Sequence, residues 1–155
     1  MKSNHLKKII LGTAQFGQTY GIKKTKLSKE EAKKIILSSK SLNIDFVDTS
    51  PTYGKAEAIL GECNLKKMFV ITKLPQMPLE VKNKEKWISE ILYGSLKKLN
   101  LSSFHAVLFH DPQIFYKNEV KQIYKILCKL KDEKIISSIG ASIYSPKILK
   151  IIFPE

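Results

Sequence analysis

MFVITK (residues 68–73), ISEILYGSLKKL (residues 88–99) and FHAVLFH (residues 104–110) follow one another in the middle of the chain and read as strand, helix and strand. The first and third segments are short apolar runs rich in β-branched and aromatic residues, which favour strands. In the second, apolar side chains recur every three or four residues and share one face of a helix. This order predicts a βαβ unit within a parallel sheet.

The same alternation extends in both directions from this unit. Short apolar runs predict a first strand within residues 8–16 and further strands at residues 44–47 and 135–141. Amphipathic segments predict helices at residues 28–42, 56–63 and 120–130, and the first of these opens with the capping box SKEE. No G-x-G-x-x-G turn follows the first strand, which argues against the usual dinucleotide-binding sheet.

The strands are expected to end at Thr13, Asp48, Lys73, His110 and Ser142. The spacing averages about 32 residues, so eight units would take roughly 258 residues, close to the ~250 typical of a (β/α)8 barrel. We therefore expect an α/β chain of the (β/α)8 TIM-barrel type, truncated to about five βα units. Residues 1–155 would form a single domain that is incomplete at its C-terminus.

The charge balance is basic but is carried by one residue type. The chain has 27 basic residues against 14 acidic ones, a formal net charge of +13, and all 27 are lysines. Arginine is the residue that pairs bidentately with guanine and phosphate, so its absence argues against sequence-specific nucleic-acid recognition. We interpret the lysines as a solvated surface that also favours anionic ligands; non-specific nucleic-acid binding is the alternative.

Other features of the composition bear on location. No apolar run approaches the roughly 18 residues that a membrane span requires, and no signal-peptide pattern opens the chain. Cys63 and Cys128 form neither a metal-binding spacing nor a disulfide framework, which fits a reducing compartment. We expect a cytoplasmic protein without a membrane segment or a bound metal.

Polar, ionisable side chains stand where successive strands are expected to end. Asp48, Lys73 and His110 follow three neighbouring strands, and Tyr53 lies in the loop after the first of them. Because the active sites of (β/α)8 barrels lie at the carboxyl ends of the strands, these four side chains are expected to converge. Taken singly, each residue can also be explained without a function: the aspartate as part of a turn, the tyrosine as an interfacial aromatic, the lysine as a surface residue and the histidine as a structural residue. Together they suit proton delivery to a developing alkoxide, as in carbonyl reduction.

These residues lie in motifs that resemble the aldo-keto reductases. The matching segments are LGTAQFG (11–17), NIDFVDTSPTYGKAEAILGE (43–62), VITK (70–73), LFHDP (108–112) and KLKDEKIISSIGAS (129–142). The resemblance covers nearly the whole chain and implies a (β/α)8 barrel that reduces aldehydes and ketones with NADPH, or with NADH. It implies that Tyr53 donates the proton, that Lys73 favours the phenolate, that Asp48 pairs with Lys73, and that His110 orients the carbonyl.

The resemblance also implies a cofactor site. Thr13 and Ser142 correspond to positions near the nicotinamide and its carboxamide, beside Asp48. Two departures stand out: Ile143 replaces the asparagine often found after the matching serine, and Ala14 replaces an aromatic residue in the first strand. GTAQFGQTYGI resembles a bacterial branch linked to surface-sugar pathways, so the expected small-molecule carbonyl substrates include sugar derivatives.

Two functions therefore remain open from the sequence. The first is NAD(P)H-dependent carbonyl reduction; the alternative is a truncated, non-catalytic relative that acts as a binding or assembly partner. With five strands, the first and last are expected to leave sheet edges unpaired, and the inner face is expected to expose Ile10, Phe46, Val70 and Val107. Such a surface favours self-association and weak cofactor binding.

Overall fold

The computed structural model describes residues 9–21 and 27–152 and has a parallel five-stranded sheet at its centre. The strands are β1 (Ile10–Gly12), β2 (Phe46–Asp48), β3 (Phe69–Leu74), β4 (Phe104–Phe109) and β5 (Ile136–Ala141). They pair in chain order, β1-β2-β3-β4-β5, and every pair is parallel. The predicted parallel sheet is confirmed.

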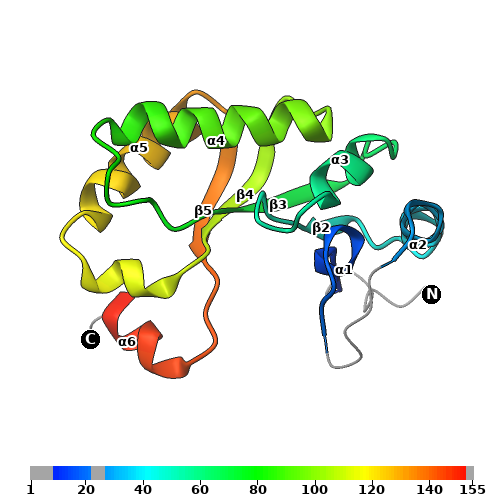
Figure 1. Cartoon of the computed structure of the whole chain (residues 1–155), viewed down its shortest axis with the longest axis horizontal. Helices are drawn as coiled ribbons and strands as arrows, with labels where there is room; N and C mark the ends of the chain where they lie inside the picture. The colour runs from blue at the N-terminus through cyan, green and yellow to red at the C-terminus, as the bar shows by residue number, and fades with distance from the viewer. Residues whose placement is uncertain (1–8, 22–26, 153–155) are drawn as a thin grey trace, which may run out of the picture.

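Helices connect the strands. The longer ones are α2 (Lys29–Ser41), α3 (Ala56–Gly61), α4 (Lys84–Leu99) and α5 (Val120–Asp132). Figure 1 shows α4 and α5 lying across one side of the sheet, while α2 and α3 continue that layer beside β1 and β2. Short turns complete the chain: α1 (Ala14–Gly17), η2 (Pro112–Tyr116), η3 (Pro146–Ile148) and α6 (Leu149–Ile152).

Local sequence signals explain where the helices begin and end. Ser28 caps α2 through the predicted capping box, in which its hydroxyl accepts from the Glu31 amide and the Glu31 carboxylate accepts from the Ser28 amide. The Asn83 side chain accepts from the Lys86 amide and caps α4. Asn100 ends α4 in the left-handed conformation, at φ 58°, which asparagine tolerates better than most residues. No helix of the described ranges is long and apolar enough to cross a bilayer.

The two faces of the sheet have different environments, and the expectation that Val70 and Val107 are exposed on the inner face was wrong. Val70 and Val107 are 2% and 0% exposed, because they point into the hydrophobic layer beneath the helices. Ile10 and Phe69 lie on the opposite face and are 51% and 47% exposed. The inner face is thus lined by the alternate residues of β3 and β4, since side chains of a strand alternate between faces.

An aromatic cluster lies on this open face. The rings of Phe46 and Phe69 stack with centroids 5.0 Å apart. The His105 ring meets both edge-on at 5.1 Å. Phe46 is half-buried by this packing, so the exposure expected for it is only partial. The face remains apolar at the amino ends of the strands, opposite to the end where the candidate site lies.

Candidate active site

Asp48 and Lys73 form an ion pair at the carboxyl ends of β2 and β3. The Lys73 Nζ donates to Asp48 Oδ1 at 2.7 Å and to Oδ2 at 2.6 Å. It also donates to the Thr49 carbonyl at 3.2 Å. Lys73 is only 4% exposed although it is one of 27 lysines. A buried ammonium needs such partners, because an unpaired buried charge is costly.

Tyr53 and His110 complete the group around this ion pair. The Lys73 Nζ lies 4.9 Å from the centroid of the Tyr53 ring, within cation–π range. The rings of Tyr53 and His110 meet edge-on, with centroids 6.0 Å apart. The structure therefore places all four side chains together at one end of the sheet.

Two hydroxyl groups contact the His110 ring. Ser50 Oγ and Thr52 Oγ1 each lie 3.4 Å from Nδ1, and they are 2.8 Å from one another. Burial lowers the pKa of His110, and the nearby Lys73 ammonium lowers it further, while the carboxylates of Asp48 and Asp111 oppose the shift. The net effect favours the neutral imidazole.

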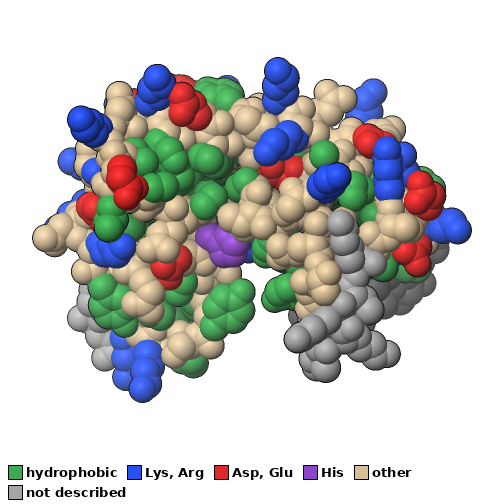
Figure 2. Space-filling model, in the orientation of Figure 1, with side chains coloured by type: hydrophobic (Ala, Val, Ile, Leu, Met, Phe, Trp, Pro, Cys, Tyr) green, Lys and Arg blue, Asp and Glu red, His purple; other side chains and the backbone are tan. Residues whose placement is uncertain are grey.

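An open pocket of about 400 Å³ lies beside the ion pair. The predicted site residues Thr13, Asp48, Tyr53, Lys73 and Ser142 all line it. Its remaining walls come from two sides: Gly12, Ala14, Gln15 and Tyr20 at the end of β1 and in the segment after it, and Leu108 on β4 with Tyr144 in the loop after β5. Figure 2 shows the molecule hollowed between these two sides, with a histidine at the head of the hollow.

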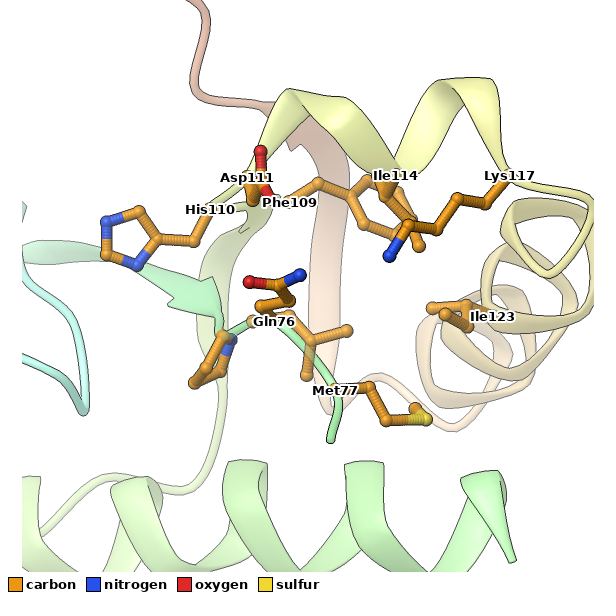
Figure 3. A pocket seen from close by; sticks show the side chains of 10 residues that line it. Gln76, Met77, Phe109, His110, Asp111, Ile114, Lys117 and Ile123 are labelled. Atoms are coloured by element: carbon orange, nitrogen blue, oxygen red, sulfur yellow. The ribbon is translucent and has the colours of Figure 1, made fainter. Parts of the chain in front are cut away.

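A much smaller hollow lies on the other side of His110. It has room for about one water molecule, at about 20 Å³, and the loop after β3 and the turn η2 form its walls. In Figure 3 the His110 ring points away from this hollow, while Met77, Ile114 and Lys117 surround it. This small hollow therefore lies behind the candidate site and does not enlarge the space for a substrate.

The two expected cofactor residues differ in what they can offer. The Thr13 hydroxyl is fully buried and donates to the Asp48 carbonyl at 2.9 Å, so it holds the end of β2 in place. Ser142 lies at the end of β5, where its amide donates to the Phe109 carbonyl at 2.9 Å. Its side chain is half-buried and lines the pocket.

Sequence reasoning missed the contacts of Ser50 and Thr52 with the His110 ring. Both lie between Asp48 and Tyr53, and that position could have indicated that their hydroxyls face the same site. In residues 9–21 and 27–152, no three His, Cys, Asp or Glu side chains lie close enough to hold a metal ion.

Comparison with known proteins shows the family of the chain. The model of the Aldo/keto reductase family matches residues 8–153. The chain belongs to the aldo/keto reductase family. A curated relative, D-arabinose 1-dehydrogenase of Saccharomyces cerevisiae, is 26% identical over 145 residues, which cover 88% of this chain and 42% of the relative.

Solved structures of aldo-keto reductases share the fold of this chain. The chain is similar to PA4992 of Pseudomonas aeruginosa, described as an aldo-keto reductase, with 27% identity and a TM-score of 0.69. The match covers 85% of this chain and 54% of that one. An aldo/keto reductase from Klebsiella pneumoniae in complex with NADP and acetate is 14% identical with a TM-score of 0.70, covering 94% and 48%. The chain thus spans about half the length of these relatives. Its sheet and helices correspond to part of their (β/α) barrel.

Proposed function

We propose that this chain carries the proton-delivery site of an NAD(P)H-dependent carbonyl reductase. The carrying observation is the position of the Lys73 ammonium, which is held by Asp48 at 2.6 Å and lies 4.9 Å from the Tyr53 ring. This arrangement puts a fixed positive charge beside a phenol at the edge of an open pocket. A family that reduces carbonyl compounds is the context in which such a phenol has a clear task.

The pocket fits the nicotinamide end of the cofactor by the chemistry of its polar groups. The half-buried Ser142 hydroxyl lines the pocket and can both donate to and accept from a carboxamide, while the buried Thr13 hydroxyl holds the Asp48 backbone beside it. A bound nicotinamide would supply the hydride; the protein supplies orientation and the proton. NADP in the Klebsiella pneumoniae relative supports a phosphorylated cofactor as the first choice, with NADH as the second.

The side chains have separate tasks in this proposal. The Tyr53 hydroxyl gives its proton to the carbonyl oxygen as the alkoxide develops. The Lys73 ammonium stabilises the remaining phenolate, and Asp48 keeps Lys73 in place. A neutral His110 whose Nδ1 accepts from Ser50 or Thr52 carries its proton on Nε2, which can donate to the substrate oxygen.

Small polar carbonyl compounds, including sugar derivatives, are the proposed substrates. The pocket is lined by hydroxyl, amide and charged groups as well as by Leu108 and Ala14. The yeast relative is a D-arabinose 1-dehydrogenase, which makes aldoses a sensible first set of compounds. Oxidation and reduction use the same site in opposite directions.

The test is a pair of tyrosine variants. Tyr53→Phe keeps the ring but removes the phenol proton, so NADPH-dependent reduction should fall about 10²–10⁴-fold. The exposed Tyr93 on α4 supplies the matched control, Tyr93→Phe, which should retain activity. NADPH fluorescence should report similar binding by wild type and Tyr53→Phe. Wild-type turnover by Tyr53→Phe would assign proton delivery to another group.

A binding or assembly role is the second candidate. It is favoured by the apolar open face, where Ile10 and Phe69 are about half exposed. An absence of carbonyl reduction together with concentration-dependent association would favour this role.

A further inference from the structure

The backbone of α1 crosses the loop that carries Tyr53 at two glycines, Gly17 and Gly54. A β-carbon on Gly17 would overlap the Tyr53 carbonyl oxygen and the Ala56 amide nitrogen, and would lie 2.7 Å from the Lys55 amide nitrogen. A β-carbon on Gly54 would lie 2.5 Å from the Gly17 carbonyl oxygen. These distances are far below ordinary contact, so the two backbones approach closely only because both residues lack side chains.

Both sides of this crossing are anchored. Phe16, next to Gly17, is 2% exposed in the hydrophobic core and fixes α1. On the other side, the Tyr53 amide donates to the Ser50 carbonyl at 3.0 Å, and the Tyr53 carbonyl accepts from the Ala56 amide at 3.1 Å. Gly54 has φ 57°, a conformation that L side chains rarely adopt. The backbone of Tyr53 is therefore held in a defined position from both directions.

We propose that Gly17 is a positioning residue for Tyr53. The proposal rests on the proposed function in one respect, namely that Tyr53 is the proton donor. Any side chain on Gly17 would push the turn after Tyr53 away from α1. The phenol lies at the far end of its side chain, so a backbone shift moves it relative to the Lys73 ammonium. A misplacement of about 1 Å at a reacting group can cost about 10²-fold in rate.

Other glycines provide matched controls. A β-carbon on Gly61 would overlap the Lys98 carbonyl oxygen and lie 3.0 Å from its carbonyl carbon, so Gly61→Ala disturbs the contact of α3 with α4 by a similar overlap. A β-carbon on Gly94 would meet nothing within 4 Å, so Gly94→Ala disturbs no contact. Gly61→Ala therefore reports general destabilisation, and Gly94→Ala reports the substitution itself.

The experiment uses ¹⁹F NMR of the full chain labelled with 3-fluorotyrosine, so it needs no catalytic activity. Tyr53→Phe assigns the Tyr53 resonance. In the wild-type background, Lys73→Met should shift this resonance, because the ammonium lies 4.9 Å from the ring. Gly17→Ala should move the resonance and remove most of its response to Lys73→Met. Gly61→Ala should lower the unfolding midpoint but leave that response intact, and Gly94→Ala should change neither.

The outcomes separate this proposal from the proposed function. An unmoved resonance that keeps its full response to Lys73→Met in folded Gly17→Ala would overturn the positioning role. If Gly17→Ala does not fold, Gly54→Ala tests the same crossing from its other side. Failure of both to fold while Gly61→Ala folds would also overturn the proposal, since the crossing would then hold the fold as a whole. Loss of the response in Gly17→Ala with no reductase activity in wild type would retain the positioning role and reject the catalytic one.

Discussion

The ammonium of Lys73 lies 2.7 and 2.6 Å from the two carboxylate oxygens of Asp48. The lysine side chain is 5% exposed and the aspartate side chain 26% exposed, so water screens the pair on the aspartate side only. A two-oxygen contact of this kind fixes the position of the charge beside Tyr53. The energetic and chemical effects of that charge can be tested separately.

Lys73→Met should reduce activity more than stability. Breaking a fully buried pair typically costs about 3–5 kcal/mol, and the partial exposure of Asp48 lowers the expected cost here. Without the ammonium, the negative charge that develops on the Tyr53 oxygen during proton transfer loses a stabilising partner, so turnover should fall. Chemical unfolding and steady-state kinetics of carbonyl reduction measure the two effects. Lys129→Met removes the exposed partner of Glu85, 3.0 Å away, and should change neither by much. Wild-type turnover in Lys73→Met would contradict the assigned role.

His110 should titrate below the ordinary histidine range. Burial lowers its pKa and Lys73 lowers it further, so the folded state resists protonation. The stability contribution is complete above the unfolded pKa and is lost as pH falls from there through the folded value. The imidazole proton signals, assigned with His110→Gln, measure the midpoint. Lys73→Met should raise this midpoint, because the carboxylates of Asp48 and Asp111 are then opposed by burial alone. A midpoint that does not move would show that Lys73 has no electrostatic influence on the ring.

Glu57 should make the fold less stable as pH rises. It is 2% exposed, and burial raises its pKa; the Ser95 hydroxyl and the Lys98 ammonium, 3.7 Å from Oε2, offset only part of that rise. A raised folded pKa gives stability that is complete below the unfolded value and is lost as pH rises through the folded value. Glu57→Gln should therefore flatten the decline of the unfolding free energy above the ordinary glutamate pKa. The exposed Glu90, changed to Gln, provides the control. An identical decline in Glu57→Gln and wild type would refute this prediction.

The open face of the sheet should promote self-association. Phe69 is 47% exposed on this face, beside Phe46 and His105. Phe69→Ser should reduce the apparent mass measured by sedimentation velocity at a given concentration, because it removes apolar area from the face. Leu79 is more exposed, at 88%, but lies in the loop after β3; Leu79→Ser should leave the association unchanged. Equal effects of the two substitutions would point to non-specific hydrophobic contact.

The order of strands and helices could be predicted from the sequence because its signals are local. An apolar run of four to six residues such as 104–109 has a strand's length, and the spacing of Ile88, Leu92 and Leu99 has a helix's period. The positions of Asp48, Lys73 and His110 at strand ends followed from the same runs. Their convergence was expected because parallel strands bring their carboxyl ends to one edge of the sheet.

Only the tertiary structure decided which side of each strand faces the helices. The sequence assigned Val70 and Val107 to the inner face, whereas the structure buries both beneath the helices and exposes Phe69. Both faces of β3 carry apolar residues, so the alternation of side chains along the strand does not indicate which face packs against the helices. The helix that packs on the sheet selects the face.

Contacts between distant residues were also beyond the sequence. Ser50 and Thr52 reach His110 across 60 and 58 residues, and Gly17 approaches the backbone of Tyr53 across a helix and a strand. A glycine in a sequence has many explanations, and its close approach to another backbone exists only once both segments are placed. The sequence by itself determined the elements and the chemistry at their ends; packing decided which groups meet, because hydrophobic burial fixes the distances between elements far apart in the chain.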